Sequence, residues 1–153
     1  SSRLSQQLRE QRGLCYSVYS YVSDHADTGF LGIYTGLSRE QEEPALETVR
    51  SIVSQLADQG PTQEELERAR EQSKANVVMG LESTQSRMSH AGRSLLFSGE
   101  ILTPEQIIAA YDSVTHEDVV ALAQEIFRWD QVSLSAVGQV RTAEAYRALV
   151  LEA

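Results

Sequence analysis

The residues best suited to chemistry lie at one junction, in the stretch LREQRGLCYSVYS over residues 8–20. Arg9 and Tyr16 stand there on either side of Gly13. A guanidinium presents a rigid fork of donors and a phenol presents one, so the pair could bind a peptide carbonyl from two directions. The residues alone leave the structural alternative open, in which Arg9 complements the negative end of a helix and Tyr16 serves as a good strand former.

Histidines are the obvious candidates for metal binding, but their spacing argues against it. His25, His90 and His116 have no second histidine or cysteine at ligand spacing. The stretch HEDVV begins like the helical zinc motif H-E-x-x-H, yet its fifth position is Val120. We therefore predict no metal site within this chain.

Cys15 is the only cysteine, and no histidine lies near it in the sequence to activate its thiol. A buried structural thiol is the better interpretation. A lone cysteine also excludes an internal disulfide and favours a reducing, cytoplasmic location. No glycine-rich phosphate loop precedes a predicted helix, so the sequence gives no support for a nucleotide site.

The composition bounds the class of protein. The 153 residues have a formal net charge of −9 and are 41% hydrophobic, which suits one globular domain. No basic patch suggests nucleic-acid binding, and no apolar run approaches the length of a membrane span. We expect a protein with neither nucleic-acid nor membrane partners.

The elements that would position Arg9 and Tyr16 are a helix and a hairpin. Residues 2–12 suit a helix that Gly13 ends, and residues 14–23 alternate as a strand. Leu14, Tyr16 and Val18 are predicted on one face of that strand and Tyr19 and Tyr21 on the other, with both faces covered. Residues 24–29 predict a turn, and residues 30–38 the returning strand.

Mostly helical segments follow the hairpin. Apolar spacing predicts a helix up to the stop at Gly60 and Pro61, and Thr62 with Glu65 forms a capping box for a long helix that Gly80 bends or ends. Further helices are predicted up to Gly99, after Thr103, after Thr115 and over residues 142–153. Residues 131–140 read as a third strand.

This order predicts an α+β fold of two layers, a single domain over residues 1–153 with helices on one face of a small, largely antiparallel sheet. A sheet of three strands is small for the number of helices that are predicted to pack on it. We therefore expect the domain to be incomplete at its N-terminus.

A long motif at the start of the chain resembles a known family. The motif S-S-R-L-x-x-x-[IVL]-R-x-x-x-G-L-x-Y-x-V is matched by Ser1, Ser2, Arg3, Leu4, Leu8, Arg9, Gly13, Leu14, Tyr16 and Val18. It resembles the C-terminal, non-zinc domain of the pitrilysin, insulin-degrading enzyme and mitochondrial processing peptidase family, in particular its small bacterial branch. LERAREQSKANVVMGLESTQSRMSHAGR, DSVTHEDVVALAQEIF and SLSAVG extend the likeness nearly end to end.

The resemblance implies a role for the Arg9 and Tyr16 pair. Family members are inverted zincins whose H-x-x-E-H motif lies in an N-terminal domain, and this sequence contains no such motif. Arg9 is implied to bind the substrate backbone, and Tyr16 to bind it and to act catalytically by donating to the scissile carbonyl as it becomes an oxyanion. One such donor is worth about 3 kcal/mol of barrier.

The function expected from the resemblance is that of the substrate-binding half of a clamshell zinc metalloendopeptidase that cleaves peptides or unfolded segments. Its partners would be the zinc-binding half, in the same protein or another subunit, and the peptide, with a second copy of the chain as a further possibility. The alternative from the same family is a non-catalytic pairing or scaffold subunit.

Overall fold

The structure, a computed structural model, describes residues 2–25 and 27–152. Ser1 of the motif, Ala26 of the predicted turn and Ala153 of the closing helix lie outside the described residues. The chain divides into two compact units, residues 1–24, 28–59 and 121–153 in the first and 25–27 and 60–120 in the second. Each unit is described by itself, and the single-domain organisation stays a prediction.

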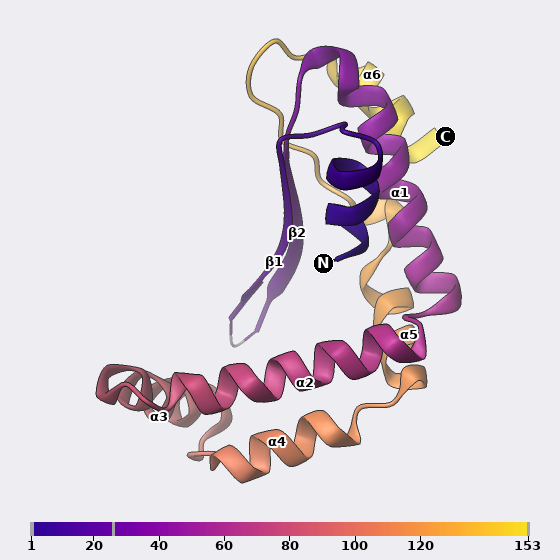
Figure 1. The fold of residues 1–153 in the computed structure, drawn as a ribbon. Coiled ribbons are helices and arrows are strands. Elements are labelled where there is room, and N and C mark those ends of the chain that lie inside the picture. The colour runs from indigo at the N-terminus through magenta and orange to yellow at the C-terminus, as the bar shows by residue number, and fades with distance from the viewer. Residues whose placement is uncertain (1, 26, 153) are drawn as a thin grey trace. The chain divides into compact units, whose positions relative to one another are not determined.

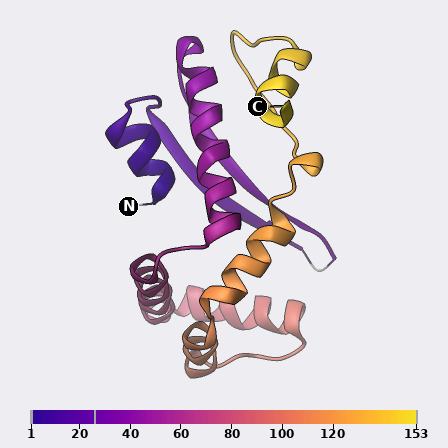
Figure 2. The ribbon, with the colours of Figure 1, turned by 90° about the vertical axis from the view of Figure 1, so that its right-hand side faces the viewer.

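The first unit contains the hairpin and the helices that pack on it. It begins with the π-helix η1 (Ser5–Gln11), followed by the strands β1 (Ser17–Asp24) and β2 (Gly29–Gly36) and the short 3-10 helix η2 (Arg39–Gln41). Helix α1 (Glu42–Gln59) then runs along one side of the hairpin, as Figures 1 and 2 show from two directions. The C-terminal part of this unit holds η3 (Trp129–Gln131), α6 (Ala143–Arg147) and η4 (Ala148–Glu152). The predicted closing helix is thereby confirmed.

The sheet is antiparallel, with β1 and β2 as its two strands within the described residues. Its register pairs Ser17 with Gly36 and Tyr19 with Tyr34. Together with the helices this confirms the predicted α+β fold.

The core lies between η1, the hairpin and α1. It consists of Leu4, Leu8, Leu14, Cys15, Val18, Ala45 and Ile52, with Ile33, Leu37 and Val49 packed against it. Apolar burial is the main force that holds these three elements together. Cys15 belongs to this core, which confirms the predicted buried thiol.

Two sequence predictions about strands are wrong. The strand predicted over residues 131–140 is not formed among the described residues: Gln131 ends η3, and Val132 has strand-like dihedral angles but joins no ladder. The alternation of Val132, Leu134 and Ala136 with polar residues favours an extended backbone, but it does not supply a hydrogen-bonding neighbour. The second error is the covering of β1 on both faces, because Val18 is buried while Tyr19, Tyr21 and Val22 are exposed.

The second unit is helical. It contains α2 (Gln63–Gly80), α3 (Thr84–Ser98) and α4 (Pro104–Ser113), and α5 (His116–Ile126) begins in it and ends in the first unit. The predicted end of α2 at Gly80 is confirmed, as are the capping boxes that begin α2 at Thr62 and α4 at Thr103. Within the described residues no helix is both long and apolar enough to cross a membrane.

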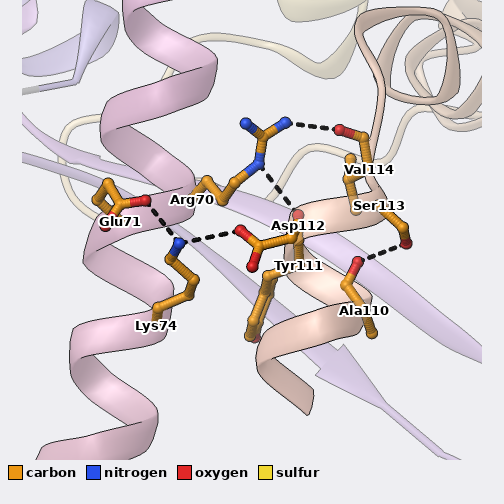
Figure 3. A network of polar contacts seen from close by, with 8 residues as sticks. All are labelled: Arg70, Glu71, Lys74, Ala110, Tyr111, Asp112, Ser113 and Val114. Carbon is orange, nitrogen blue, oxygen red and sulfur yellow. Dashed lines mark hydrogen bonds and ion pairs between the residues drawn. The ribbon is translucent and has the colours of Figure 1, made fainter. Parts of the chain in front are cut away.

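Two basic side chains of α2 connect it to the end of α4, as Figure 3 shows. Arg70 donates to the carbonyl oxygens of Tyr111 at 3.1 Å and Val114 at 2.8 Å, which satisfies acceptors left open at the helix end. Lys74 pairs with Glu71 at 2.7 Å and Asp112 at 2.9 Å. These two carboxylates raise the pKa of Lys74.

Candidate functional site

The junction between η1 and β1 is fixed by a left-handed turn. Gly13 has φ +61°, a conformation that glycine adopts without steric cost. The Leu14 amide then donates to the Leu8 carbonyl oxygen at 2.7 Å across the turn. Because Leu8 and Leu14 are both buried, the backbone between them is held at both ends.

Arg12 secures the same turn to α1. Its guanidinium donates to the hydroxyl oxygen of Thr48, which is buried and itself donates to the Pro44 carbonyl oxygen at 2.6 Å. Arg12 therefore has a structural role, in agreement with its place at the helix end.

An open polar hollow adjoins this contact. Its lining residues are Gln7, Arg12, Glu47, Thr48 and Ser51. Arg12 and Glu47 contribute opposite charges to this hollow, and the other lining residues are neutral and polar.

Tyr16 lies just before β1, beyond the first pair of the ladder. Its amide donates to the Gly36 carbonyl oxygen at 3.0 Å, while the register pairs Gly36 with Ser17. This bond holds the backbone of Tyr16 beside the first pair of the ladder. Tyr16 does not share the buried face of Val18 as the sequence predicted, because Tyr16 is 93% exposed while Val18 is 8% exposed.

Arg9 also presents its side chain to solvent. It lies in the last turn of η1, is 52% exposed, and forms an ion pair with the neighbouring Glu10 at 3.6 Å. Exposed ion pairs of this kind are weak, so a ligand carboxylate or carbonyl can compete for the guanidinium. Both predicted site residues are accessible, and their convergence on one carbonyl group stays a prediction.

The three histidines occupy separate places. His25 is exposed at the hairpin turn, and His90 lies 3.2 Å from the Leu102 carbonyl oxygen. His116 packs so closely on Gly60 that a Cβ at that glycine would lie 2.5 Å from the imidazole Nε2. Across residues 2–25 and 27–152, no three or more His, Cys, Asp or Glu residues are grouped to hold a metal ion. These residues do not fit a zinc site.

Sequence reasoning missed the exposed aromatic face of the hairpin, which is formed by Tyr19, Tyr21, Phe30 and Tyr34. The Tyr19 and Tyr34 rings stack at a centroid distance of 5.0 Å, and the Tyr21 and Phe30 rings meet edge to face at 5.8 Å. The signal was present in the alternation of Tyr19 and Tyr21 opposite Phe30 and Tyr34. This exposed face was missed because both faces of the strand were predicted to be covered.

Comparison with known proteins shows which family the segment around this junction matches. Residues 1–73 match the family model described as the Peptidase M16 inactive domain, a range that contains η1, the hairpin and α1. An uncharacterized zinc protease of Streptomyces coelicolor is 40% identical over 96% of this chain, and the uncharacterized zinc protease YmxG of Bacillus subtilis is 42% identical over 85%. The chain spans 32% of the length of each of these relatives.

The fold is shared with a solved protease structure. A crystal structure of a protease from Helicobacter pylori superposes on 84% of this chain with a TM-score of 0.69, at 23% sequence identity. The chain covers 31% of that protein. The family predicted from the motif is confirmed by these findings.

Proposed function

We propose that this chain, which belongs to the peptidase M16 family through its inactive domain, is the substrate-binding part of a zinc metalloendopeptidase. Arg9 binds the substrate backbone, and Tyr16 donates a hydrogen bond to the scissile carbonyl oxygen. The observation that carries the proposal is that Tyr16 is almost fully exposed while its amide is bonded to the Gly36 carbonyl oxygen. A tyrosine that only packed in the core would be buried, whereas Tyr16 is exposed on a backbone that is hydrogen-bonded to β2.

The chemistry proposed for Tyr16 is electrostatic. When a peptide carbonyl is attacked, its oxygen gains negative charge, and a phenol hydroxyl already aimed at that oxygen stabilises the charge without rearranging solvent. The preceding backbone is pinned on both sides by Leu14 and by the bond to Gly36, which limits how far Tyr16 moves.

The zinc ion and the groups that activate water are proposed to lie outside this chain. The relatives are named zinc proteases and are about three times as long as this chain, whereas the described residues group no metal ligands. When bound in its own domain, zinc supplies the Lewis acid and the nucleophile. The contribution of this chain is to hold and orient the peptide.

A reconstitution experiment tests this assignment. We expect the purified chain alone to bind no stoichiometric zinc and to hydrolyse no unfolded protein, and hydrolysis to appear when the zinc-binding half is added. Metal analysis that finds one tightly bound zinc per chain, with hydrolysis by the chain alone, would contradict the proposal. A complex that forms without hydrolysis would favour the scaffold alternative.

A further inference from the structure

A hydroxyl group lies among the buried residues of α1. The residues of this helix that are buried are Ala45, Thr48, Ile52 and Val53. Thr48 is the polar member of this set, and it is 4% exposed. Valine has nearly the same shape and would avoid the cost of burying a hydroxyl group. Packing alone therefore does not explain a threonine at this position.

The Thr48 hydroxyl both donates and accepts a hydrogen bond. It donates to the Pro44 carbonyl oxygen at 2.6 Å, one turn earlier in α1. Because a hydroxyl has a single hydrogen, this bond fixes its rotation and leaves its oxygen as an acceptor. The Arg12 guanidinium donates to that oxygen. Hydrogen bonds from a charged donor are stronger than those between neutral groups, so this bond joins the end of η1 firmly to α1.

The bond to Thr48 is formed where the backbone changes direction. Arg12 is the C-cap of η1 and immediately precedes Gly13, whose φ is +61°. The Leu14 amide closes the turn by donating to the Leu8 carbonyl oxygen at 2.7 Å. The direction in which the chain leaves this turn determines where β1 begins.

Tyr16 depends on this backbone for its position. Because its side chain is almost fully exposed, packing contributes little to where its hydroxyl lies. On the downstream side, its amide donates to the Gly36 carbonyl oxygen at 3.0 Å. On the upstream side, the backbone leads back to the Gly13 turn, which Thr48 holds through Arg12. One anchor on β2 and one on α1 therefore fix the backbone that carries the phenol.

We propose that Thr48 is a positioning residue of the protease, which acts through Arg12 and the Gly13 turn to hold the Tyr16 hydroxyl at the scissile carbonyl. The inference rests on the proposed function, because it explains how the phenol of that site is held. A misplacement of about 1 Å can lower a rate by about a hundredfold, so the position of this donor matters. Since Thr48 is buried, it acts on the geometry of the site and not by contact with the substrate.

The kinetics of Thr48 variants in the reconstituted protease test this inference. Thr48→Val keeps the shape and removes the hydroxyl. We expect its kcat to fall by about tenfold with KM nearly unchanged, because the affected hydrogen bond stabilises the transition state. Thr48→Ser keeps the hydroxyl and should retain most of kcat. A folded Thr48→Val variant with the kcat of the parent would overturn the proposal.

Ser51→Ala is the matched control for these variants. Ser51 lies three residues further along α1 and lines the same hollow as Thr48. Its hydroxyl accepts from the Gln55 amide at 3.3 Å. We expect Ser51→Ala to have the kcat of the parent, and a fall equal to that of Thr48→Val would overturn the proposal.

A double-mutant cycle shows whether Thr48 acts through Tyr16. In the Tyr16→Phe background the hydroxyl to be positioned is absent, so Thr48→Val should lower kcat little further. The same fold-change in both backgrounds would overturn the proposal and leave the role of Tyr16 standing. If Tyr16→Phe itself leaves kcat unchanged, the proposed function fails and the inference fails with it.

Amide hydrogen exchange of the chain gives a readout that does not depend on activity. Thr48→Val should accelerate exchange several-fold at the Leu14 and Tyr16 amides, whose bonds hold the turn and the start of β1. The Leu66 amide, which belongs to α2 in the other unit, should exchange at the rate of the parent. Equal acceleration at Leu66 would indicate a general loss of stability and would overturn the proposal.

The bond can also be removed from its exposed side. Arg12→Ala deletes the donor and leaves the Thr48 hydroxyl bonded to the Pro44 carbonyl oxygen, so the buried hydroxyl keeps a partner. We expect the same fall in kcat and the same local acceleration of exchange as in Thr48→Val. If circular dichroism shows that Thr48→Val does not fold, this variant decides the test, and parental kcat and exchange rates in it would overturn the proposal.

Discussion

At the scale of single residues, two arginines of η1 that look alike in the sequence have different roles. Arg12 bonds the buried Thr48 hydroxyl, whereas Arg9 forms an exposed ion pair with Glu10. A charged group bonded to a buried partner contributes to stability, while an exposed pair contributes little. Substitutions at the two positions can therefore distinguish a role in stability from a role in substrate binding.

Replacing Arg9 with alanine is expected to weaken substrate binding and leave stability unchanged. Because its guanidinium contacts the bound peptide in both the ground state and the transition state, KM of the reconstituted protease should rise by about tenfold with little change in kcat. Arg12→Ala should leave KM unchanged and lower the free energy of unfolding by about 1 kcal/mol. Steady-state kinetics and urea unfolding of both variants measure the two effects, and an Arg9→Ala variant with unchanged KM would remove Arg9 from the site.

At the scale of elements, the turn at Gly13 determines where β1 begins and hence where Tyr16 points. A side chain at φ +61° is strained even though no atom lies within 4 Å of the added Cβ. Gly92, in the interior of α3, also has open space around its Cβ but no positive φ. Comparing alanine substitutions at the two glycines therefore separates the effect of backbone conformation from the effect of packing.

Gly13→Ala is expected to destabilise the chain by about 1–2 kcal/mol, the cost of a left-handed conformation for a residue with a Cβ. Gly92→Ala should stabilise it by about 1 kcal/mol, because alanine is the better helix former. Chemical unfolding followed by circular dichroism gives both values. Equal effects at the two positions would show that the left-handed turn is not required.

Local signals in the sequence predicted most elements. They did not predict hydrogen bonds between residues that are far apart in the sequence. The Thr62 and Thr103 capping boxes were predictable because every participating residue lies within one turn. The bond from the Tyr16 amide to the Gly36 carbonyl oxygen was not, since Gly36 lies twenty residues further along the chain. The strand predicted over residues 131–140 was wrong for the same reason, because a strand needs a hydrogen-bonding neighbour that its own sequence does not determine.

At the scale of the whole molecule, a polar clamp connects the C-terminal helix of the first unit to the start of α1. The Tyr146 hydroxyl donates to a Glu42 carboxylate oxygen at 2.6 Å, and Arg141 pairs with the other oxygen at 3.0 Å. The Tyr146 hydrogen bond first, and then Arg141, lowers the pKa of Glu42. These residues are about a hundred positions apart, so the clamp joins two segments of the first unit that are distant in the sequence.

Glu42 makes stability depend on pH in a defined direction. Because its folded pKa lies below the ordinary value of 4.5, its contribution is fully present above that value and is lost as the pH falls through the folded pKa. We expect Glu42→Gln to lower Tm at pH 7 and to flatten the fall of Tm below pH 4.5. The matched control is Glu43→Gln, whose ion pair with Arg141 is longer, at 3.7 Å, and half-exposed. Its Tm profile should follow that of the parent.

The role of Tyr16 is tested most directly by the kinetics of Tyr16→Phe in the reconstituted protease. The substitution removes one hydroxyl from a side chain that is 93% exposed, so stability should not change. If the hydroxyl stabilises the developing oxyanion, kcat falls by about a hundredfold or more while KM stays nearly constant. An unchanged kcat, or a change confined to KM, would contradict the role assigned to Tyr16.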